Sequence, residues 1–124
     1  MILKELLGKT LVEARNTGHA IVFEDTEGTR YSLHHDDVCC ESVYIEDVIG
    51  NLEDLVGSPL LMAESEYNSD EPKKWENTNR TDESFTWTFY KFATVKGYVT
   101  IRFYGSSNGY YSETASLHVN GNRV

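Results

Sequence analysis

The chain has 124 residues, of which 40% are hydrophobic and 25% are charged, and its formal net charge is -9. This length and composition predict one globular domain with a hydrophobic core of its own, and no apolar run is long enough for a transmembrane helix. Twenty acidic residues oppose eleven basic ones, which argues against binding to long nucleic acid, because its phosphate backbone requires clustered lysine and arginine.

The N-terminal part of the chain predicts a short helical turn followed by an antiparallel meander. Leucines at helical spacing indicate a turn over residues 2–8, which Gly8 ends. Strands are expected at residues 10–13, 20–24 and 29–34, because turn-forming Asn, Asp and Gly separate these runs.

The middle of the chain mixes strand and helix signals. Residues 43–45 favour a strand-like entry, and a short helix is expected over residues 47–56, where apolar residues recur at helical spacing. A strand is then expected over residues 58–66. The acidic, polar segment 65–84 predicts a long mobile loop. Within it, Trp75 is either a loop anchor or a residue of a lid that closes on a ligand or a neighbouring subunit.

Three strands are expected in the remainder, at residues 85–94, 97–105 and 110–119, with hairpin turns at 95–97 and 106–109. Together these elements predict the α+β class. The fold is expected to be a single domain containing an antiparallel β-sheet of about six to eight strands with one or two short helices.

Most of the aromatic side chains lie between residues 85 and 111, and alternation gives the strand at 97–105 two different faces. One face predicts an ordinary core: Val99, Ile101 and Phe103. The other could stack on a ring and bind a phosphate, or could simply face solvent: Tyr98, Thr100, Arg102 and Tyr104.

The run from His34 to Glu41 is rich in possible metal ligands, including His34, His35, Cys39 and Cys40. Because the run is contiguous and no distant Cys-x-x-Cys or His-x-x-x-His accompanies it, an intrachain zinc site is less expected than a buried cysteine pair with surface acids. A turn that orders a loop or an oligomer contact is the remaining alternative. Adjacent cysteines rarely bridge each other, so no disulfide framework is expected, which fits a reducing compartment. The charged N-terminus does not look like a signal peptide, which favours a cytoplasmic protein.

Several motifs in their order resemble a family of small phage and prophage proteins that includes the first-described Thoeris anti-defence protein. They are His34-His35, the segments 39–47, 53–60, 86–92 and 96–102, and Tyr104 to Ser112. In Thoeris defence, a TIR-domain enzyme makes a cyclic ADP-ribose isomer that activates a killing effector. The resemblance implies a sponge that binds this signal without altering it, in the host cytoplasm during phage infection. It also implies a homo-oligomer with pockets between subunits, in a family of which some members hold cyclic oligonucleotides.

The expected function is therefore sequestration of a cyclic nucleotide, with no catalytic residue, metal or cofactor and no membrane partner. The candidate ligand-binding residues are Arg102, Tyr104, Asn108, Tyr110, Trp87, Phe89 and Tyr98. Further candidates for the wall of the pocket are Tyr90, Lys91 and Arg80. Two alternatives stay open. One is a protein-interaction module that uses the aromatic face, and the other is a metal-dependent phosphodiester hydrolase that uses the His-Asp-Cys run.

Overall fold

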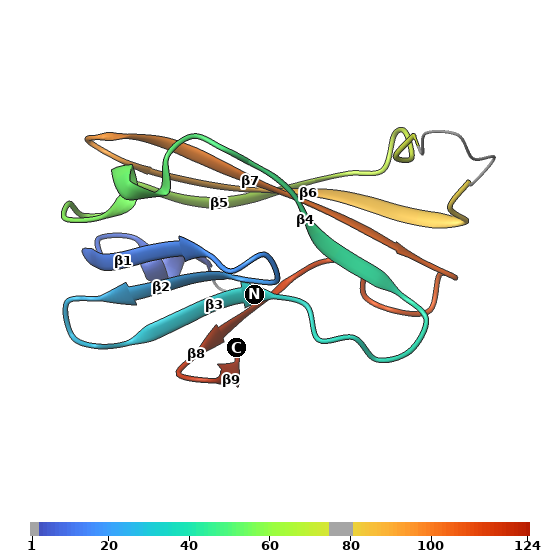
Figure 1. Ribbon diagram of the computed structural model, residues 1–124, viewed down its shortest axis with the longest axis horizontal. Helices are drawn as coiled ribbons and strands as arrows, with labels where there is room; N and C mark the ends of the chain where they lie inside the picture. Colours follow the sequence, from blue (N-terminus) through green and yellow to red (C-terminus); the bar gives the residue numbers. More distant parts are fainter. Residues whose placement is uncertain (1–2, 75–80) are drawn as a thin grey trace.

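The computed structural model describes residues 3–74 and 81–124. In this part of the chain, nine strands form two antiparallel sheets that lie one over the other (Figure 1). The first sheet has the order β1 (Leu11–Asn16), β2 (Ile21–Asp25), β3 (Arg30–His34), β8 (Ser116–Val119) and β9 (Asn122–Arg123). The second sheet has the order β4 (Ser42–Ile49), β7 (Gly97–Ser107), β6 (Ser84–Thr94) and β5 (Met62–Asn68).

The expectation of a small, antiparallel single domain is confirmed, but the α+β class and the one-sheet arrangement are wrong. The described helical segments are two 3-10 turns, η1 (Leu3–Leu6) and η2 (Leu52–Leu55). The meander expected in the N-terminal part is present as β1, β2 and β3. The protein is therefore mostly β, with two layers in place of one sheet covered by helices.

The helix expected over residues 47–56 is wrong because its first apolar residues belong to a strand. Val48 and Ile49 pair with β7 at the end of β4. Gly50 follows with a φ of 110°, a conformation that favours glycine, and so ends the strand. The side chain of Asn51 then accepts a hydrogen bond from the backbone N–H of Glu53 and caps η2. A strand end and a 3-10 turn together produced the helical spacing.

The hairpin turn expected at residues 106–109 and the strand over 110–119 are also wrong. β7 continues to Ser107, and the chain then crosses to the other sheet, where β8 covers residues 116–119 alone and pairs with β3. By contrast, the two-residue turn after Thr94 joins β6 to β7 in register, as expected. The crossover connects the two sheets through the C-terminal part of the chain.

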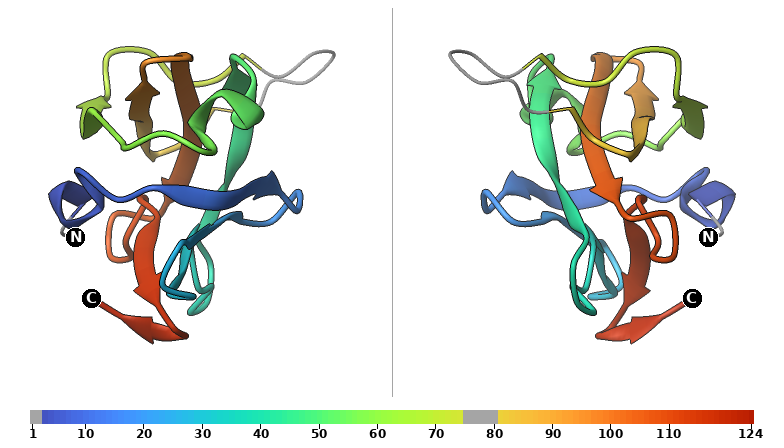
Figure 2. Two further views of the ribbon diagram at one scale, coloured as in Figure 1. Left: turned by 90° about the vertical axis from the view of Figure 1, so that its left-hand side faces the viewer. Right: turned by 90° about the vertical axis from the view of Figure 1, so that its right-hand side faces the viewer.

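The hydrophobic core lies between the two sheets. Alternate residues of β2, β3 and β6 are buried, and Val99, Ile101 and Phe103 of β7 belong to the core, which confirms the apolar face expected for β7. The largest fully buried core side chains include Phe23, Tyr90, Phe92 and Phe103. η1 contributes Leu3 and Leu6 to the core, and Figure 2 shows this turn at the start of β1, at one edge of the molecule.

The acidic segment 65–84 does not begin as a loop, because β5 extends to Asn68 in register with β6. Residues 65–68 are therefore strand. Trp75 and Arg80 lie outside the described residues. In the part of the chain that is described, no helix has the length and apolar character needed to cross a membrane.

Candidate ligand-binding site

Two rows of side chains run across the four strands of the second sheet, on the face opposite to the core. The first row is Glu66, Phe89, Arg102 and Asp47. The second row is Asn68, Trp87, Tyr104 and Tyr44. Residues that pair directly across antiparallel strands share a face and can touch. The register therefore places the only arginine of β7 beside two aromatic residues of β6.

Arg102 is held by two acidic residues of β4. The pairing of β4 with β7 shifts between Ile45 and Asp47, and the extra residue in this irregularity is Glu46. Both Nε and Nη2 of Arg102 lie 2.6 Å from Glu46 Oε2, and Nη2 lies 3.7 Å from Asp47 Oδ2. Glu46 and Asp47 therefore engage the edge of the guanidinium that carries Nε and Nη2.

Trp87 connects Arg102 to the segment that follows β5. The guanidinium carbon of Arg102 lies 5.6 Å from the centroid of the Trp87 ring, within cation–π range. The indole Nε1 donates a hydrogen bond of 2.7 Å to the backbone carbonyl of Glu71. These contacts fix the plane of the Trp87 ring over the sheet.

A pocket of about 510 Å³ opens at this point. Its lining residues are Asn68, Asp70, Glu71, Trp87, Phe89 and Arg102. The volume falls in the range of about 300–1,000 Å³ that is typical of small-molecule sites. The pocket combines two aromatic rings, one guanidinium, one amide and two carboxylates, so it can stack on a ring, contact an anionic group and accept hydrogen bonds from hydroxyls.

Tyr104 supports the pocket from behind and presents no open ring. Its side chain is fully buried, and its ring centroid lies 4.5 Å from that of Trp87. Its hydroxyl donates to Asp82 Oδ2 at 2.6 Å and accepts from the backbone N–H of Lys73 at 3.2 Å. Burial and then the hydrogen bond to Asp82 raise the pKa of Tyr104 to about 12. Tyr104 therefore stays protonated and ties β7 to the connection between β5 and β6.

The structure brings together three of the seven candidate residues, Arg102, Trp87 and Phe89, with Tyr104 behind them. Tyr98 lies four positions away along β7, opposite Ala93, and is exposed. Asn108 lines a different pocket of about 310 Å³, together with Cys40 and Ser42. Tyr110 is 89% exposed beyond the end of β7. These three side chains do not join the pocket within one copy of the chain.

The two further wall candidates within the described residues do not line the pocket either. Tyr90 points into the core, where it is fully buried and its hydroxyl accepts from the backbone N–H of Ala115. Lys91 pairs with Glu66 at 2.8 Å on the outer face. The position of Tyr90 follows from alternation, because Tyr90 is adjacent to Phe89 in β6 and so points to the opposite face of the sheet.

The pocket also contains residues that sequence reasoning missed, namely Asn68, Asp70 and Glu71. The strand signal of β5 carried no sign of its extension to Asn68, and in a chain this acidic Asp70 and Glu71 looked like surface charge. The position of Glu46 beside Arg102 depends on the irregularity in β4, for which local sequence gives no signal. The one signal in the sequence was Arg102 itself, because a charged side chain on an aromatic strand face requires acidic side chains nearby.

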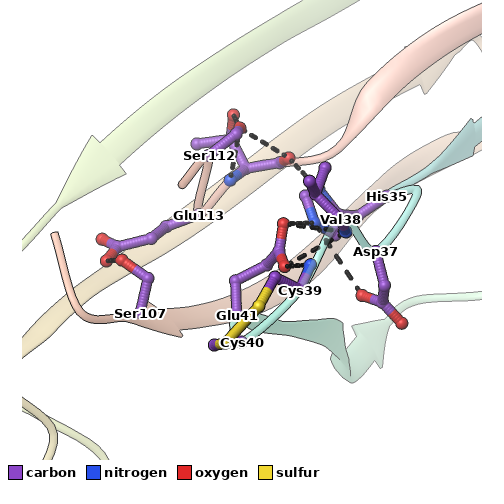
Figure 3. Close-up of polar contacts among 10 residues, drawn as sticks. His35, Asp37, Val38, Cys39, Cys40, Glu41, Ser107, Ser112 and Glu113 are labelled. Carbon is purple, nitrogen blue, oxygen red and sulfur yellow. Dashed lines mark hydrogen bonds and ion pairs between the residues drawn. A yellow bond between two sulfur atoms is a disulfide. The ribbon is translucent and has the colours of Figure 1, made fainter. Parts of the chain in front are cut away.

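A second polar feature is the loop between β3 and β4, where Glu41 organises the backbone (Figure 3). The Glu41 carboxylate accepts hydrogen bonds from the backbone N–H groups of Val38 and Cys39 and lies 3.1 Å from His35 Nε2. The Cys39 hydrogen bond is the main cause that lowers the pKa of Glu41 to about 2. The buried carboxylate therefore stays ionised and holds the loop in a tight turn.

The cysteines were expected to be a buried pair without a bond, and this is wrong. Cys39 and Cys40 are exposed and are joined by a disulfide (Figure 3). The physical reason for their exposure is that Glu41 occupies the buried position at the base of the turn, and its hydrogen bonds turn the preceding residues outward.

Comparison with known proteins gives the chain a family. No curated protein and no solved structure matches it. A family model described as a domain of unknown function, DUF7448, matches residues 4–117. That match spans both sheets, from η1 to β8, and includes the pocket and the Glu41 loop. The chain therefore belongs to the DUF7448 family.

Proposed function

We propose that the protein binds a cyclic ADP-ribose isomer in the pocket at Trp87, Phe89 and Arg102 and holds it chemically unchanged. In this proposal it is a phage anti-defence sponge that keeps the Thoeris effector inactive in the host cytoplasm. The nature of the signal comes from the resemblance of the sequence motifs. The observation that supports binding is the meeting of two rings and a guanidinium in one pocket of suitable volume.

The pocket offers a separate contact for each part of such a ligand. An adenine ring stacks on Trp87 or Phe89, which contributes about 1–3 kcal/mol by analogy with bases on aromatic side chains. The carboxylates of Asp70 and Glu71 accept hydrogen bonds from ribose hydroxyls. The amide of Asn68 can both donate to and accept from polar groups of the base.

Arg102 supplies the positive charge for the pyrophosphate. A ligand phosphate contacts Nη1, while Nε and Nη2 keep their bonds to Glu46. This division matters because Glu46, Asp47, Asp70 and Glu71 surround the cation with negative charge. Without Arg102 the pocket would repel a dianion, so the guanidinium is the determinant of phosphate binding.

A second copy of the chain completes the enclosure in this proposal. Competition with a cellular receptor requires a dissociation constant in the nanomolar range, which corresponds to about -12 kcal/mol. Tight small-molecule sites bury about 70–90% of the ligand surface, and the pocket residues come from one face of one sheet and the segment after β5. A homo-oligomer with pockets between subunits supplies the missing wall.

The test is titration followed by recovery of the ligand. Calorimetry of the full chain with a panel of cyclic ADP-ribose isomers, ADP-ribose and cyclic oligonucleotides should give nanomolar binding to at least one cyclic ADP-ribose isomer. After heat denaturation, chromatography should return that ligand intact and in stoichiometric amount. Absence of uptake from the whole panel would refute the proposal, and recovery of a cleaved product would identify an enzyme instead.

The contribution of the pocket is separated from that of the fold by a matched pair of variants. Trp87→Ala should weaken binding by at least tenfold, because it removes the stacking surface beside Arg102. Tyr98→Ala removes an exposed aromatic residue of the same sheet that does not line the pocket, and it should bind like the wild type. Equal affinities for the two variants would place the ligand elsewhere.

A further inference from the structure

Two histidines and an aspartate that are far apart in the sequence meet on the first sheet. His34 Nε2 lies 3.2 Å from Asp36 Oδ1, and His118 Nε2 lies 3.1 Å from Asp36 Oδ2. The two oxygens of one carboxylate thus contact two different imidazoles. The ligand-capable atoms of the three residues all lie within 4.8 Å of one another.

The pairing of β3 with β8 creates this cluster. Ser32 pairs with His118 and His34 pairs with Ser116, so the two histidines are diagonal neighbours on one face of the sheet. Asp36 follows two residues after the end of β3 and turns back over that face. The sequence pattern does not predict the third ligand, because the hairpin expected at residues 106–109 would place His118 on a strand next to residues 97–105.

We propose that His34, Asp36 and His118 bind one divalent transition-metal ion of the zinc class. Two imidazoles and one carboxylate form a donor set that such ions accept, with the remaining positions filled by water or a further ligand. Asp36 is largely exposed, whereas the side chains of His34 and His118 are 18% and 7% exposed. The ion would therefore sit at the surface, anchored by two largely buried rings.

Binding requires a small rearrangement of the rings. Their centroids are 3.9 Å apart and their planes differ by 14°, so they are stacked. An ion bound at about 2.0–2.1 Å from each nitrogen allows a ligand separation of at most about 4.2 Å, and it lies in the plane of each ring. The stack must open for both Nε2 atoms to face the ion.

One ring nitrogen of His118 lacks a hydrogen-bond partner among the described residues, which bears on the opening of the stack. Its Nδ1 is buried and has no hydrogen-bond partner in the part of the chain that the structure describes. The corresponding atom of His34 lies 2.6 Å from Ser32 Oγ, which is the second contact expected of a metal-binding histidine. Rotation of the His118 ring would separate it from the stacked His34 ring and would also move Nδ1 out of its present buried position.

His35, the neighbour of His34 in the sequence, has contacts at both ring nitrogens and provides a reference. His35 Nδ1 lies 3.2 Å from the carbonyl oxygen of Thr114, and its Nε2 lies 3.1 Å from Glu41. Both of its ring nitrogens therefore have partners within the chain. Metal binding at the cluster should leave the His35 ring signals in place.

The experiment is calorimetric titration of the chelator-treated, tag-free full chain with Zn²⁺ and separately with Mg²⁺. We expect one Zn²⁺ per chain with a dissociation constant of 10 µM or tighter and at least 100-fold weaker Mg²⁺ binding, because imidazole favours the transition metal. In imidazole ¹H–¹⁵N spectra, Zn²⁺ should shift His34 and His118 and leave His35 unchanged. Absence of stoichiometric Zn²⁺ binding would overturn the proposal.

Matched variants distinguish this site from general binding to an acidic surface. Asp36→Asn should weaken Zn²⁺ binding at least tenfold without unfolding the chain, because Asp36 is exposed. Asp37→Asn removes the neighbouring exposed carboxylate and should bind within twofold of the wild type. Equal affinity of Asp36→Asn and the wild type would assign the ion to other residues and refute the cluster.

Discussion

Arg102 and Glu46 are joined through two nitrogens and a single carboxylate oxygen, although 56 positions separate them in the sequence. The contact depends on the register shift in β4, where Asp47 pairs with Arg102 and Glu46 is the extra residue without a partner on β7. Arg102 is thereby held in one orientation before any ligand arrives. A preorganised side chain loses little entropy on binding, which favours high affinity.

The first prediction concerns this arginine. Arg102→Gln should raise the dissociation constant of the cyclic nucleotide at least tenfold, because a charge-assisted bond to phosphate contributes about 1.5–3 kcal/mol. The measurement is calorimetric titration, with circular dichroism to verify the fold.

Arg30 provides the matched control for Arg102. Its Nε also contacts a glutamate, Glu24 at 2.9 Å, but on the first sheet. Arg30→Gln changes the net charge of the protein by the same amount as Arg102→Gln, and it should leave the affinity for the cyclic nucleotide within twofold of the wild type. If both variants lost affinity equally, the effect would be one of overall charge and Arg102 would not contact the ligand.

The second prediction concerns pH. The pKa of Glu41 is lowered in the folded protein from 4.5 to about 2, so ionised Glu41 stabilises the fold fully above its unfolded pKa. This contribution should be lost as the pH falls from about 4.5 toward 2. Urea unfolding at pH 7, 4.5 and 3 should therefore show that the free energy of unfolding falls more steeply with decreasing pH for the wild type than for Glu41→Gln.

The control for Glu41 is Glu64, an exposed residue of β5. Glu64→Gln should retain the wild-type acid profile, because this carboxylate is exposed on the strand. Glu41→Gln should already be less stable at pH 7, where the ionised group accepts the N–H groups of Val38 and Cys39. If the free energy of unfolding of Glu41→Gln varied with pH in parallel with that of the wild type, Glu41 would be excluded as the titrating group.

The third prediction compares two glycines of β7. A Cβ added to Gly105 would overlap the carbonyl oxygen of Glu113, which belongs to the backbone and cannot move aside. A Cβ added to Gly97 would meet the side chain of Asp54 at 2.6 Å, which can rotate away. Gly105→Ala should therefore lower the free energy of unfolding by at least about 2 kcal/mol more than Gly97→Ala.

Chemical denaturation of the two glycine variants checks this difference. Both positions lie in the same strand and lack a left-handed φ, so the comparison isolates the steric overlap. Similar stabilities would mean that the crossing segment around Glu113 is free to shift away from β7.

Strand identity was predictable from the sequence where the pattern was local. Alternation in β6 and β7 placed Val99, Ile101 and Phe103 in the core and Arg102 on the other face, as observed. The pattern could not tell whether residues after Ser107 would turn back or cross, because Asn108-Gly109 suits a hairpin and is also compatible with an irregular crossing. The number of sheets depended on that choice.

The site was predictable only in part for the same reason. Trp87, Phe89 and Arg102 meet because adjacent strands pair, which the hairpin signal at residues 95–97 implied. Tyr104 was expected to present an open ring, but Asp82 and Lys73 cover it through contacts from outside the strand. Burial by a polar segment leaves no trace in strand periodicity, so neither this cover nor the acidic lining could be anticipated.

The pairing of β3 with β8 has a consequence for the folding of the nascent chain during synthesis. The backbone N–H of Arg30 donates to the side chain of Asn120, a partner 90 positions downstream, so the chain must be synthesised through β8 and Asn120 before the first sheet can close. Until then β3 is an exposed edge strand, whose unpaired N–H and C=O groups can pair with other chains. Long-range closure of this kind slows folding. A prematurely terminated product that ends before Ser116 would therefore tend to aggregate.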